Sequence, residues 1–297
     1  MYKPKFVVII TTYLRAEALG RCLNIMENQT RLPDELVIVV RDTDLKTREF
    51  IEKYRDDNNL FRITVLFVSI PGYLPPLKEG LRVAEGDYVG ILDDDVLVKS
   101  NWVEKALLAF YESGPRIGAV VGAQFCSNTK KGNVFPAKLS WFGRFAVIKN
   151  LSVRTDNINA FCEGNMVFRG EISRKLEVDF RLNNGRIAHH GLDLGLQVIG
   201  SGWKILYEPL LNAEHLALQE QWNIDKVQNI QSYVANLAII IKKHFGKKRL
   251  FFFAIYNIAM GQYSMPGLLY FLFKNKVQYK NVSLTRIELL TALFQST

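Results

Sequence analysis

Three consecutive acids, Asp93, Asp94 and Asp95, directly follow an apolar segment of β type over residues 87–92. Neighbouring carboxylates repel one another and ionised groups resist burial, so this cluster costs free energy unless a cation, a proton or open water relieves it. The cluster therefore predicts a bound ligand at this point of the chain. A solvated acidic turn is the alternative interpretation.

Polar residues also lie at the ends of two other β-type segments, 5–12 and 35–40. They are Thr11, Thr12, Tyr13 and Arg15 at the first end and Arg41, Asp42 and Asp44 at the second. In parallel sheets, ligands bind beyond the carboxyl ends of the strands, where loops present polar groups. We therefore expect these side chains and the acid cluster to converge on one crevice.

Strand-like and helical segments alternate through the first 124 residues. The continuous apolar run 5–12 is typical of a strand that is covered on both faces, and apolar residues at helical spacing predict a helix over 15–29. The other predicted strands are 35–40, 63–68, 87–92 and 117–124, and the other predicted helices are 45–56, 76–85 and 100–113. This alternation predicts an α/β fold with a Rossmann-like, mostly parallel sheet and helices on both faces.

The second half of the chain has a less regular pattern. Residues 125–160 are irregular and rich in Phe, Asn and Lys, while 162–168 has the pattern of a strand. A short helix is predicted over 189–202, where glycines end it, and a strand over 203–215 leads to His215.

Composition and charge narrow the class of protein. The 297 residues are 48% hydrophobic, enough for one large α/β domain or two smaller ones. The three cysteines have no paired or metal-type spacing and the N-terminus lacks a signal-peptide layout, so we expect a reducing, cytoplasmic setting. Of the net charge of +9, residues 217–297 carry +7, from ten Lys or Arg and three acids. Because the part with the acid cluster is nearly balanced, we expect no nucleic-acid partner.

Residues 250–273 form a run of 24 residues without a charge, with basic residues on both sides. The length permits a membrane span, but polar residues and the Pro266-Gly267 pair divide the run, and a single span normally has one basic flank. We therefore expect 242–273 to bind the inner face of the membrane peripherally, with five Lys or Arg in 242–249 attracting anionic lipid. Packing on the rest of the chain and a homodimer contact are the alternatives.

Five blocks follow one another in the chain: VVIITTYLRAEALGRCL, ELVIVVRDTD, GLRVAEGDYVGILDDDV, GNMVFRG and DLGLQVIGSGWKILYEPLLNAEH. Together they resemble the ordered blocks of family 2 glycosyltransferases, which are inverting enzymes with the GT-A fold. The resemblance covers roughly residues 5–216, and the order of the blocks is more specific than any one of them. It implies a catalytic domain over 1–216, with a nucleotide-sugar half over about 1–125 and an acceptor half over about 126–216. Residues 217–297 would form a basic, aromatic helical tail.

The resemblance implies a metal site in the acid cluster. Asp93 resembles the acid near the ribose and the metal, and Asp95 resembles the acid that binds Mg²⁺ or Mn²⁺. Asp94 is the variable middle residue and, on an extended segment, is expected to point away from the other two. His215 resembles a histidine that completes the metal shell in several relatives, which favours Mn²⁺; a structural histidine is the alternative. A divalent cation would stabilise the charge that develops on a leaving diphosphate.

The nucleotide-sugar site that the resemblance implies comprises Thr11, Thr12, Tyr13, Arg15, Asp42, Lys78, Asp93 and Asp94. Asp42 matches an acid that contacts the base or ribose, and Lys78 stands where the family often has Asn. An aromatic face and a short acid are suited to holding a nucleoside. The alternatives are core packing for Tyr13, a turn cap for Asp42 and a solvated position for Lys78.

An inverting transfer also needs a general base that takes the proton from the acceptor hydroxyl. The family usually has Glu-Asp-x-Asp-Leu at a helix start, and here His190 and Gly191 stand in the places of the first two acids. Asp193 aligns with the last acid, and we predict it as the base, with Glu163 and His190 as the other candidates. Simple N-capping is the alternative for Asp193.

The sequence thus predicts a metal-dependent inverting glycosyltransferase that moves a sugar from a nucleotide diphosphate, with UDP favoured, to a glycan or lipid-linked acceptor in polysaccharide or glycolipid synthesis. A sugar-phosphate nucleotidyltransferase shares the sheet type but would need a Gly-rich phosphate loop, which TTYLRAEALG lacks. Because Gly191 replaces an expected acid, a glycosyltransferase-like scaffold that binds a nucleotide sugar or a membrane partner without turnover is the second interpretation.

Overall fold

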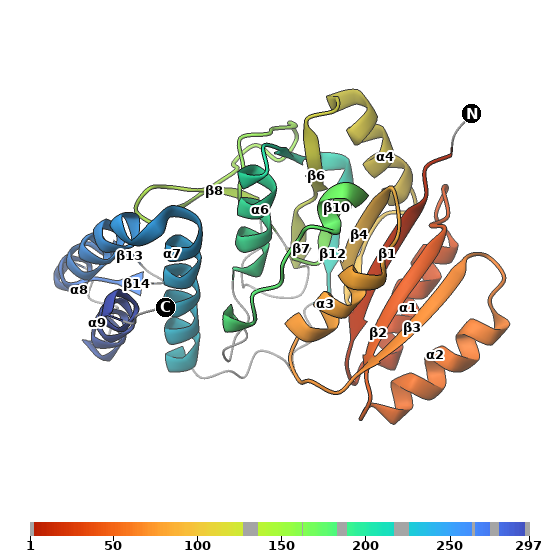
Figure 1. The fold of residues 1–297 in the computed structure, drawn as a ribbon, viewed down its shortest axis with the longest axis horizontal. Coiled ribbons are helices and arrows are strands. Elements are labelled where there is room, and N and C mark those ends of the chain that lie inside the picture. The colour runs from red at the N-terminus through yellow and green to blue at the C-terminus, as the bar shows by residue number, and fades with distance from the viewer. Residues whose placement is uncertain are drawn as a thin grey trace.

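The computed structural model describes residues 3–126, 136–161, 163–182, 189–216, 226–262, 265–273 and 279–294. Its centre is a sheet of seven strands in the order β11-β6-β10-β4-β1-β2-β3 (Figure 1). The strands are β1 (Phe6–Thr12), β2 (Glu35–Arg41), β3 (Arg62–Val68), β4 (Tyr88–Asp93), β6 (Ile117–Val121), β10 (Asn165–Arg169) and β11 (Lys204–Tyr207). All neighbours pair in parallel except β10, which is antiparallel to both β4 and β6. The predicted mostly parallel α/β sheet is confirmed.

Helices cover both faces of this sheet, as the continuous apolar strands predicted. Phe6, Val8 and Ile10 of β1 belong to the hydrophobic cluster of one face, and Val7 and Ile9 belong to the other, because successive side chains of a strand point in opposite directions. The first cluster includes residues of α1 (Ala16–Glu27), α2 (Leu45–Asp57) and α4 (Trp102–Ser113). The second includes residues of α3 (Leu74–Val83), α6 (His190–Gly200) and α7 (Lys226–Ala259).

A smaller sheet corrects two of the predicted strands. It has the order β5-β12-β7, formed by β5 (Val96–Leu97), β12 (Ala213–His215) and β7 (Gln124–Cys126). The single strand predicted over 203–215 is wrong, because the 3₁₀ helix η2 (Pro209–Leu211) separates β11 from β12. The Glu208 side chain accepts a hydrogen bond from the backbone of Leu210 and so caps this turn. The predicted strand 117–124 likewise ends at Val121, and β7 begins in the other sheet.

Short elements complete the part of the chain before residue 217. A hairpin is formed by β8 (Ala137–Leu139) and β9 (Phe145–Val147), within the segment predicted to be irregular. The helix α5 (Gly170–Ser173) directly follows β10, and the 3₁₀ helix η1 (Phe180–Leu182) precedes α6. The predicted strand 162–168 is observed as β10, while Cys162 lies outside the described residues.

The C-terminal helices pack onto the α/β part and share its core. α7 is kinked at Gly246, where φ is 80°, and the ribbon of β13 (Gly261–Gln262) and β14 (Met265–Pro266) separates it from α8 (Leu268–Phe273). The last helix is α9 (Tyr279–Phe294).

Val234 and Ile241 of α7 belong to the same hydrophobic cluster as the sheet, and α7 lies beside α6 (Figure 1). A domain boundary near residue 216 stays a prediction. Among the described residues, no helix combines the length and apolar character needed to cross a membrane.

Candidate functional site

A pocket of about 510 Å³ opens at the carboxyl ends of β1 and β4. Its walls are formed by Thr11, Thr12, Tyr13, Arg15, Arg41, Pro71, Gly72, Tyr73, Pro76, Asp93, Asp94, Asp95 and His215. The structure thus brings together the first-strand loop, the acid cluster and His215, which the sequence placed at separate strand ends. A volume of this size lies within the usual range for a small-molecule site.

The pairing of β1 with β4 sets the distance between the two loops. Thr11 lies opposite Asp93 in the parallel register, and the Thr12 hydroxyl donates to Asp94 Oδ2 at 2.6 Å. Beyond Thr12 the chain turns at Leu14, whose φ of 55° lies in the left-handed region that non-glycine residues rarely adopt. The Leu14 backbone N–H donates to Asp44 Oδ2 at 2.5 Å, and this bond holds the strained loop over the pocket.

Arg15 supplies the positive charge that the acid cluster requires. Its Nη1 lies 2.7 Å from Asp94 Oδ1 and 3.0 Å from Asp95 Oδ2, and both carboxylates are almost fully buried. The expectation that Asp94 points away from the other acids is wrong, because β4 ends at Asp93 and the next two residues form a turn. Asp94 and Asp95 therefore share one guanidinium.

Asp93 lies in the most repulsive position of the cluster. Burial, followed by repulsion from Asp95 and Asp94, raises its pKa to about 8, although the Tyr73 hydroxyl donates to its Oδ1 at 3.2 Å. Burial also raises the pKa of Asp94 to about 6, against the opposing effects of Arg15 and Thr12. A side chain at Gly164 would begin 2.1 Å from Asp93 Oδ2, so glycine is required beside this acid. An added cation in the pocket would relieve the repulsion.

The residues suit a metal that is shared with a ligand better than a closed protein cage. Asp95 Oδ1 and His215 Nε2 are 3.4 Å apart at the pocket wall, and two neighbouring ligands of an octahedral ion are about 3 Å apart. Within the described residues, no group of three or more His, Cys, Asp or Glu side chains forms a complete metal site. Mg²⁺ and similar ions commonly take one or two carboxylates plus phosphates and waters, so the donor set fits an ion that binds with a diphosphate.

The nucleoside candidates differ in their placement. Tyr13 is exposed at the pocket wall, with the Arg41 guanidinium 5.6 Å from its ring centre, so core packing does not apply. Asp42 is outside the pocket wall, but its Oδ1 is buried without a hydrogen-bond partner in the described part of the chain. Asp44, and not Asp42, caps α2 by accepting from Thr47 N at 3.2 Å. A buried acceptor without a partner is costly, which favours a ligand contact at Asp42.

Tyr73 is a site residue that the sequence interpretation missed. It lies between β3 and α3, and its ring contacts both the acid cluster and the His190 ring, whose centre is 4.9 Å away. Its position after the third predicted strand was the signal that could have identified it. That strand ends at the same edge of the sheet as the three strands whose ends were considered. By contrast, Lys78 is exposed, with its Nζ 5.0 Å from the Phe180 ring, and it does not line the pocket.

The three candidate bases occupy different environments. Glu163 precedes β10 and keeps 29% of its side chain exposed, and its Oε1 lies 3.5 Å from His190 Nδ1. His190 is buried, and that burial lowers its pKa despite the nearby carboxylates of Glu163 and Asp193. Asp193 lies in the first turn of α6, as predicted, but its side chain is only 2% exposed.

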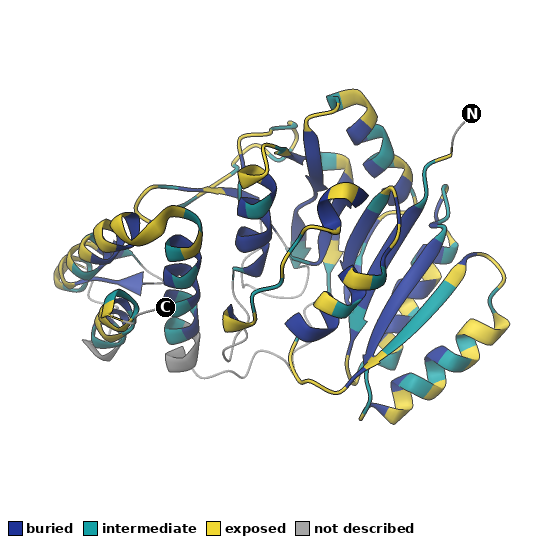
Figure 2. Cartoon of the chain, viewed as in Figure 1, coloured by how far each residue is buried: buried dark blue, intermediate teal, exposed yellow. Residues whose placement is uncertain are grey.

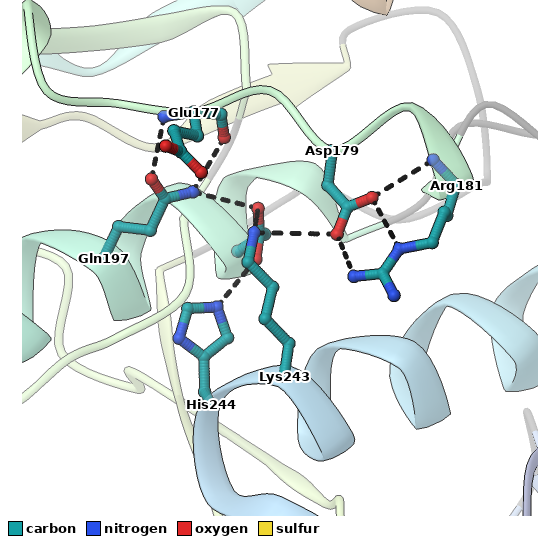
Figure 3. A network of polar contacts seen from close by, with 7 residues as sticks. Glu177, Asp179, Arg181, Gln197, Lys243 and His244 are labelled. Atoms are coloured by element: carbon teal, nitrogen blue, oxygen red, sulfur yellow. Dashed lines mark hydrogen bonds and ion pairs between the residues drawn. The ribbon is translucent and has the colours of Figure 1, made fainter. Parts of the chain in front are cut away.

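Asp193 is surrounded by donors, two of which come from α7. Figure 3 shows these two side chains, Lys243 and His244, on their helix. His244 Nε2 lies 2.6 Å from its Oδ1, and its Oδ2 accepts from Lys243 Nζ at 2.9 Å and from Gln197 Nε2 at 3.0 Å. Lys243 also approaches Asp179 at 3.6 Å, and Asp179 is held by Arg181. These contacts indicate that Asp193 stabilises the packing of α6 against α7.

The fold and the sequence both relate this chain to known glycosyltransferases. The profile described as Glycosyl transferase family 2 matches residues 7–177, more than half of the chain. The chain therefore belongs to glycosyl transferase family 2, as the five blocks predicted, and carries a transferase domain.

Individual proteins show the same relationship. A validoxylamine A glucosyltransferase of Streptomyces hygroscopicus subsp. jinggangensis (strain 5008) is 32% identical over 123 residues, which cover 40% of this chain and 28% of that protein. This chain thus spans well under half the length of that curated relative. The structure of S. aureus TarS 1–349 in complex with UDP has a TM-score of 0.61 at 14% identity, covering 98% of this chain and 81% of that one.

A second structural neighbour is the mannosyltransferase PcManGT from Pyrobaculum calidifontis in complex with GDP-Man and Mn²⁺. Its TM-score is 0.54 at 16% identity, with 98% of this chain and 86% of that chain covered. At this identity the neighbours establish the fold alone. The predicted GT-A-type architecture is confirmed.

We predict that Asp193→Asn lowers the free energy of unfolding by about 2 to 3 kcal/mol, because hydrogen bonds to a buried charged group are lost at the α6–α7 contact. Urea unfolding followed by circular dichroism measures this change. Glu177→Gln is the control, since the Glu177 side chain is exposed and the two hydrogen bonds between Gln197 and Glu177 use the Glu177 backbone. Equal stability of the two variants would show that the contact contributes little.

Proposed function

We propose that this protein is a metal-dependent inverting glycosyltransferase that uses a nucleotide diphosphate sugar, with UDP-sugars favoured. The observation that carries the proposal is the meeting of Asp93, Asp95, Arg15 and His215 at one pocket at the carboxyl edge of the sheet. Family membership supports the reaction class, and the structural neighbours were determined with UDP in one case and with GDP-Man and Mn²⁺ in the other.

Asp95 and His215 are the residues that would hold the metal, with Mn²⁺ favoured over Mg²⁺ because imidazole is one of the ligands. When bound, a divalent cation neutralises charge on the diphosphate and so makes it a better leaving group. Asp93 lies beside this position, and Tyr73 fixes its carboxylate. Arg15 contacts two of the acids and is within reach of an anionic ligand in the same pocket.

The nucleoside would lie toward the loops after β1 and β2. Tyr13 offers an exposed aromatic face, and Asp42 offers a buried oxygen without a partner in the described part of the chain. Thr11 and Thr12 line the pocket between these residues and the acid cluster. This arrangement supports a donor half over about 1–125 within a catalytic unit that extends to about residue 216.

The proposal extends to peripheral binding at the cytoplasmic face of an anionic membrane and to a glycan or lipid-linked acceptor, and exposed apolar side chains of the C-terminal helices support the membrane contact. Phe251, Phe252 and Ile255 near the end of α7 are about half exposed, as are several side chains of α8 (Figure 2). One expectation is corrected, however. Of the five basic residues counted on in 242–249, Lys243 pairs with Asp193 and Arg249 is buried against Trp141 and Phe245, so these two are turned to the protein.

Mn²⁺ together with UDP at 100 times its Kd should raise the melting temperature by about 5 °C, because binding to the native state adds about 2.7 kcal/mol. In Asp95→Asn this shift should fall below about 1 °C, since one of the two protein ligands of the metal is lost. Differential scanning fluorimetry measures both values.

Asp56→Asn serves as the control for that experiment, because this carboxylate is exposed on α2 and pairs only with its neighbour Arg55 in the described structure. A larger shift with GDP than with UDP would reassign the nucleotide. No shift with either nucleotide, with or without Mn²⁺, would contradict the proposed donor class.

Vesicles of phosphatidylcholine with about 30% phosphatidylglycerol should co-sediment with the protein and release it in high salt, because exposed Lys247 and Lys248 are screened by ions. The double change Phe251→Ser and Phe252→Ser should reduce the bound fraction several-fold by removing apolar area from the contact. Tyr111→Ser is the control, since Tyr111 is 87% exposed on α4. Equal binding by all three proteins would exclude this surface.

A further inference from the structure

We propose that Glu163 is the general base of the transfer and that it occupies the space left by the missing acid at Gly191. This inference rests on the proposed function and specifies which carboxylate of the site receives the proton. Its basis is the geometry around the start of α6, where the chain lacks the acid that the family pattern predicts and another carboxylate is present in its place.

Gly191 and Glu163 are in direct contact. The Gly191 backbone N–H donates to Glu163 Oε1 at 3.2 Å. A Cβ atom built on Gly191 would lie 2.6 Å from the Phe161 carbonyl oxygen, 3.1 Å from Glu163 Cγ and 3.4 Å from Glu163 Cδ. The Phe161 carbonyl therefore excludes a side chain at residue 191, and the Glu163 side chain lies directly beside the space that this glycine leaves open at the start of α6.

Glu163 also lies beside the pocket that holds the acid cluster. The next residue, Gly164, packs directly against the Asp93 carboxylate. His190 links the two regions, because its Nδ1 is 3.5 Å from Glu163 Oε1 and its ring lies against that of Tyr73, which lines the pocket. With 29% of its side chain exposed, Glu163 remains open to an acceptor. This places a carboxylate at the edge of the donor pocket on the side of α6.

The other two candidates lack that combination of proximity and access. Asp193 is 2% exposed, and Lys243, His244 and Gln197 occupy its oxygens. His190 is 8% exposed at its side chain and buried between Tyr73 and Glu163, which leaves little access for an acceptor. Among the three, Glu163 alone has an accessible carboxylate.

In the proposed step, a Glu163 oxygen accepts the proton of the acceptor hydroxyl as that hydroxyl oxygen forms its bond to the anomeric carbon. The bond from that carbon to the diphosphate oxygen breaks on the opposite face, and its electron pair leaves with the nucleotide diphosphate. Glu163 then returns the proton to water. No oxidant or further reactant is needed.

The test uses the full chain with Mn²⁺ and a panel of UDP-glucose, UDP-N-acetylglucosamine, UDP-galactose and GDP-mannose, with water as the acceptor. Release of UDP or GDP measures turnover, and calorimetry measures the Kd of UDP or GDP with Mn²⁺. We expect Glu163→Gln to lower kcat by about 10²- to 10⁴-fold with the Kd unchanged within about threefold. Glu177→Gln, the same change at an exposed site, should retain both values.

A second variant separates proton transfer from a structural role. Glu163→Ala should regain part of its turnover when sodium formate is added, and Glu163→Gln should lose the acidic limb of the pH profile of kcat. Turnover of Glu163→Gln within about threefold of the unmodified protein would overturn the assignment and leave the proposed function intact. Loss of nucleotide binding together with turnover would also overturn it, since Glu163 would then support the fold.

Two results with the unmodified protein complete the range of outcomes. Nucleotide binding without any turnover of the panel would overturn the assignment and favour the scaffold interpretation that Gly191 suggested. Neither binding nor turnover would contradict the proposed function itself. The failure of the base assignment and the failure of the glycosyltransferase proposal are therefore distinguishable.

Discussion

The arrangement of this pocket depends on how the charge of Asp93, Asp94 and Asp95 is compensated at the end of a buried strand. Repulsion and burial both destabilise the ionised carboxylates. One guanidinium, one threonine hydroxyl and one tyrosine hydroxyl offset part of this cost by donating hydrogen bonds to them. The compensation is incomplete, because the pKa of Asp93 still rises to about 8. A site left short of positive charge is one that gains free energy from a cation, and a cation in turn attracts a diphosphate. The proposed use of a metal ion and a nucleotide diphosphate sugar follows from this incomplete compensation of charge.

Most of the sheet and much of the pocket could be predicted from the sequence, because both depend on short-range patterns. Continuous β-branched runs identify strands such as β1 and β2, and the parallel order brings their ends to one edge, so Thr11, Asp93 and their neighbours were placed correctly. Features that depend on the path of the chain were missed. The turn after Asp93 brings Asp94 to Arg15, β10 runs antiparallel, and Tyr73 enters the pocket from a loop whose sequence has no distinctive pattern.

Contacts between distant segments explain why the C-terminal part was harder to interpret. From the sequence, Lys243 and Arg249 were counted as charges that bind the membrane. In the structure, Lys243 pairs with Asp193 and Arg249 donates to the Ser140 carbonyl, and both partners lie far earlier in the chain. The basic residues of α7 therefore have two roles. Some of them hold the helix on the α/β part, and the exposed ones beyond the kink at Gly246 are available for the proposed membrane contact. An amphipathic helix can serve both purposes because its two faces are independent.

The proposal of Glu163 over Asp193 as the base follows the position of each carboxylate in space and not its position in the sequence. Alignment alone favours Asp193, but that acid is buried, and its oxygens are already occupied by Lys243 and His244 of α7. Glu163 comes from a different element, yet its carboxylate reaches the start of α6 because Gly191 leaves room for it. A missing acid in a motif is thus weak evidence against catalysis when a neighbouring loop, here the one before β10, holds a carboxylate close by.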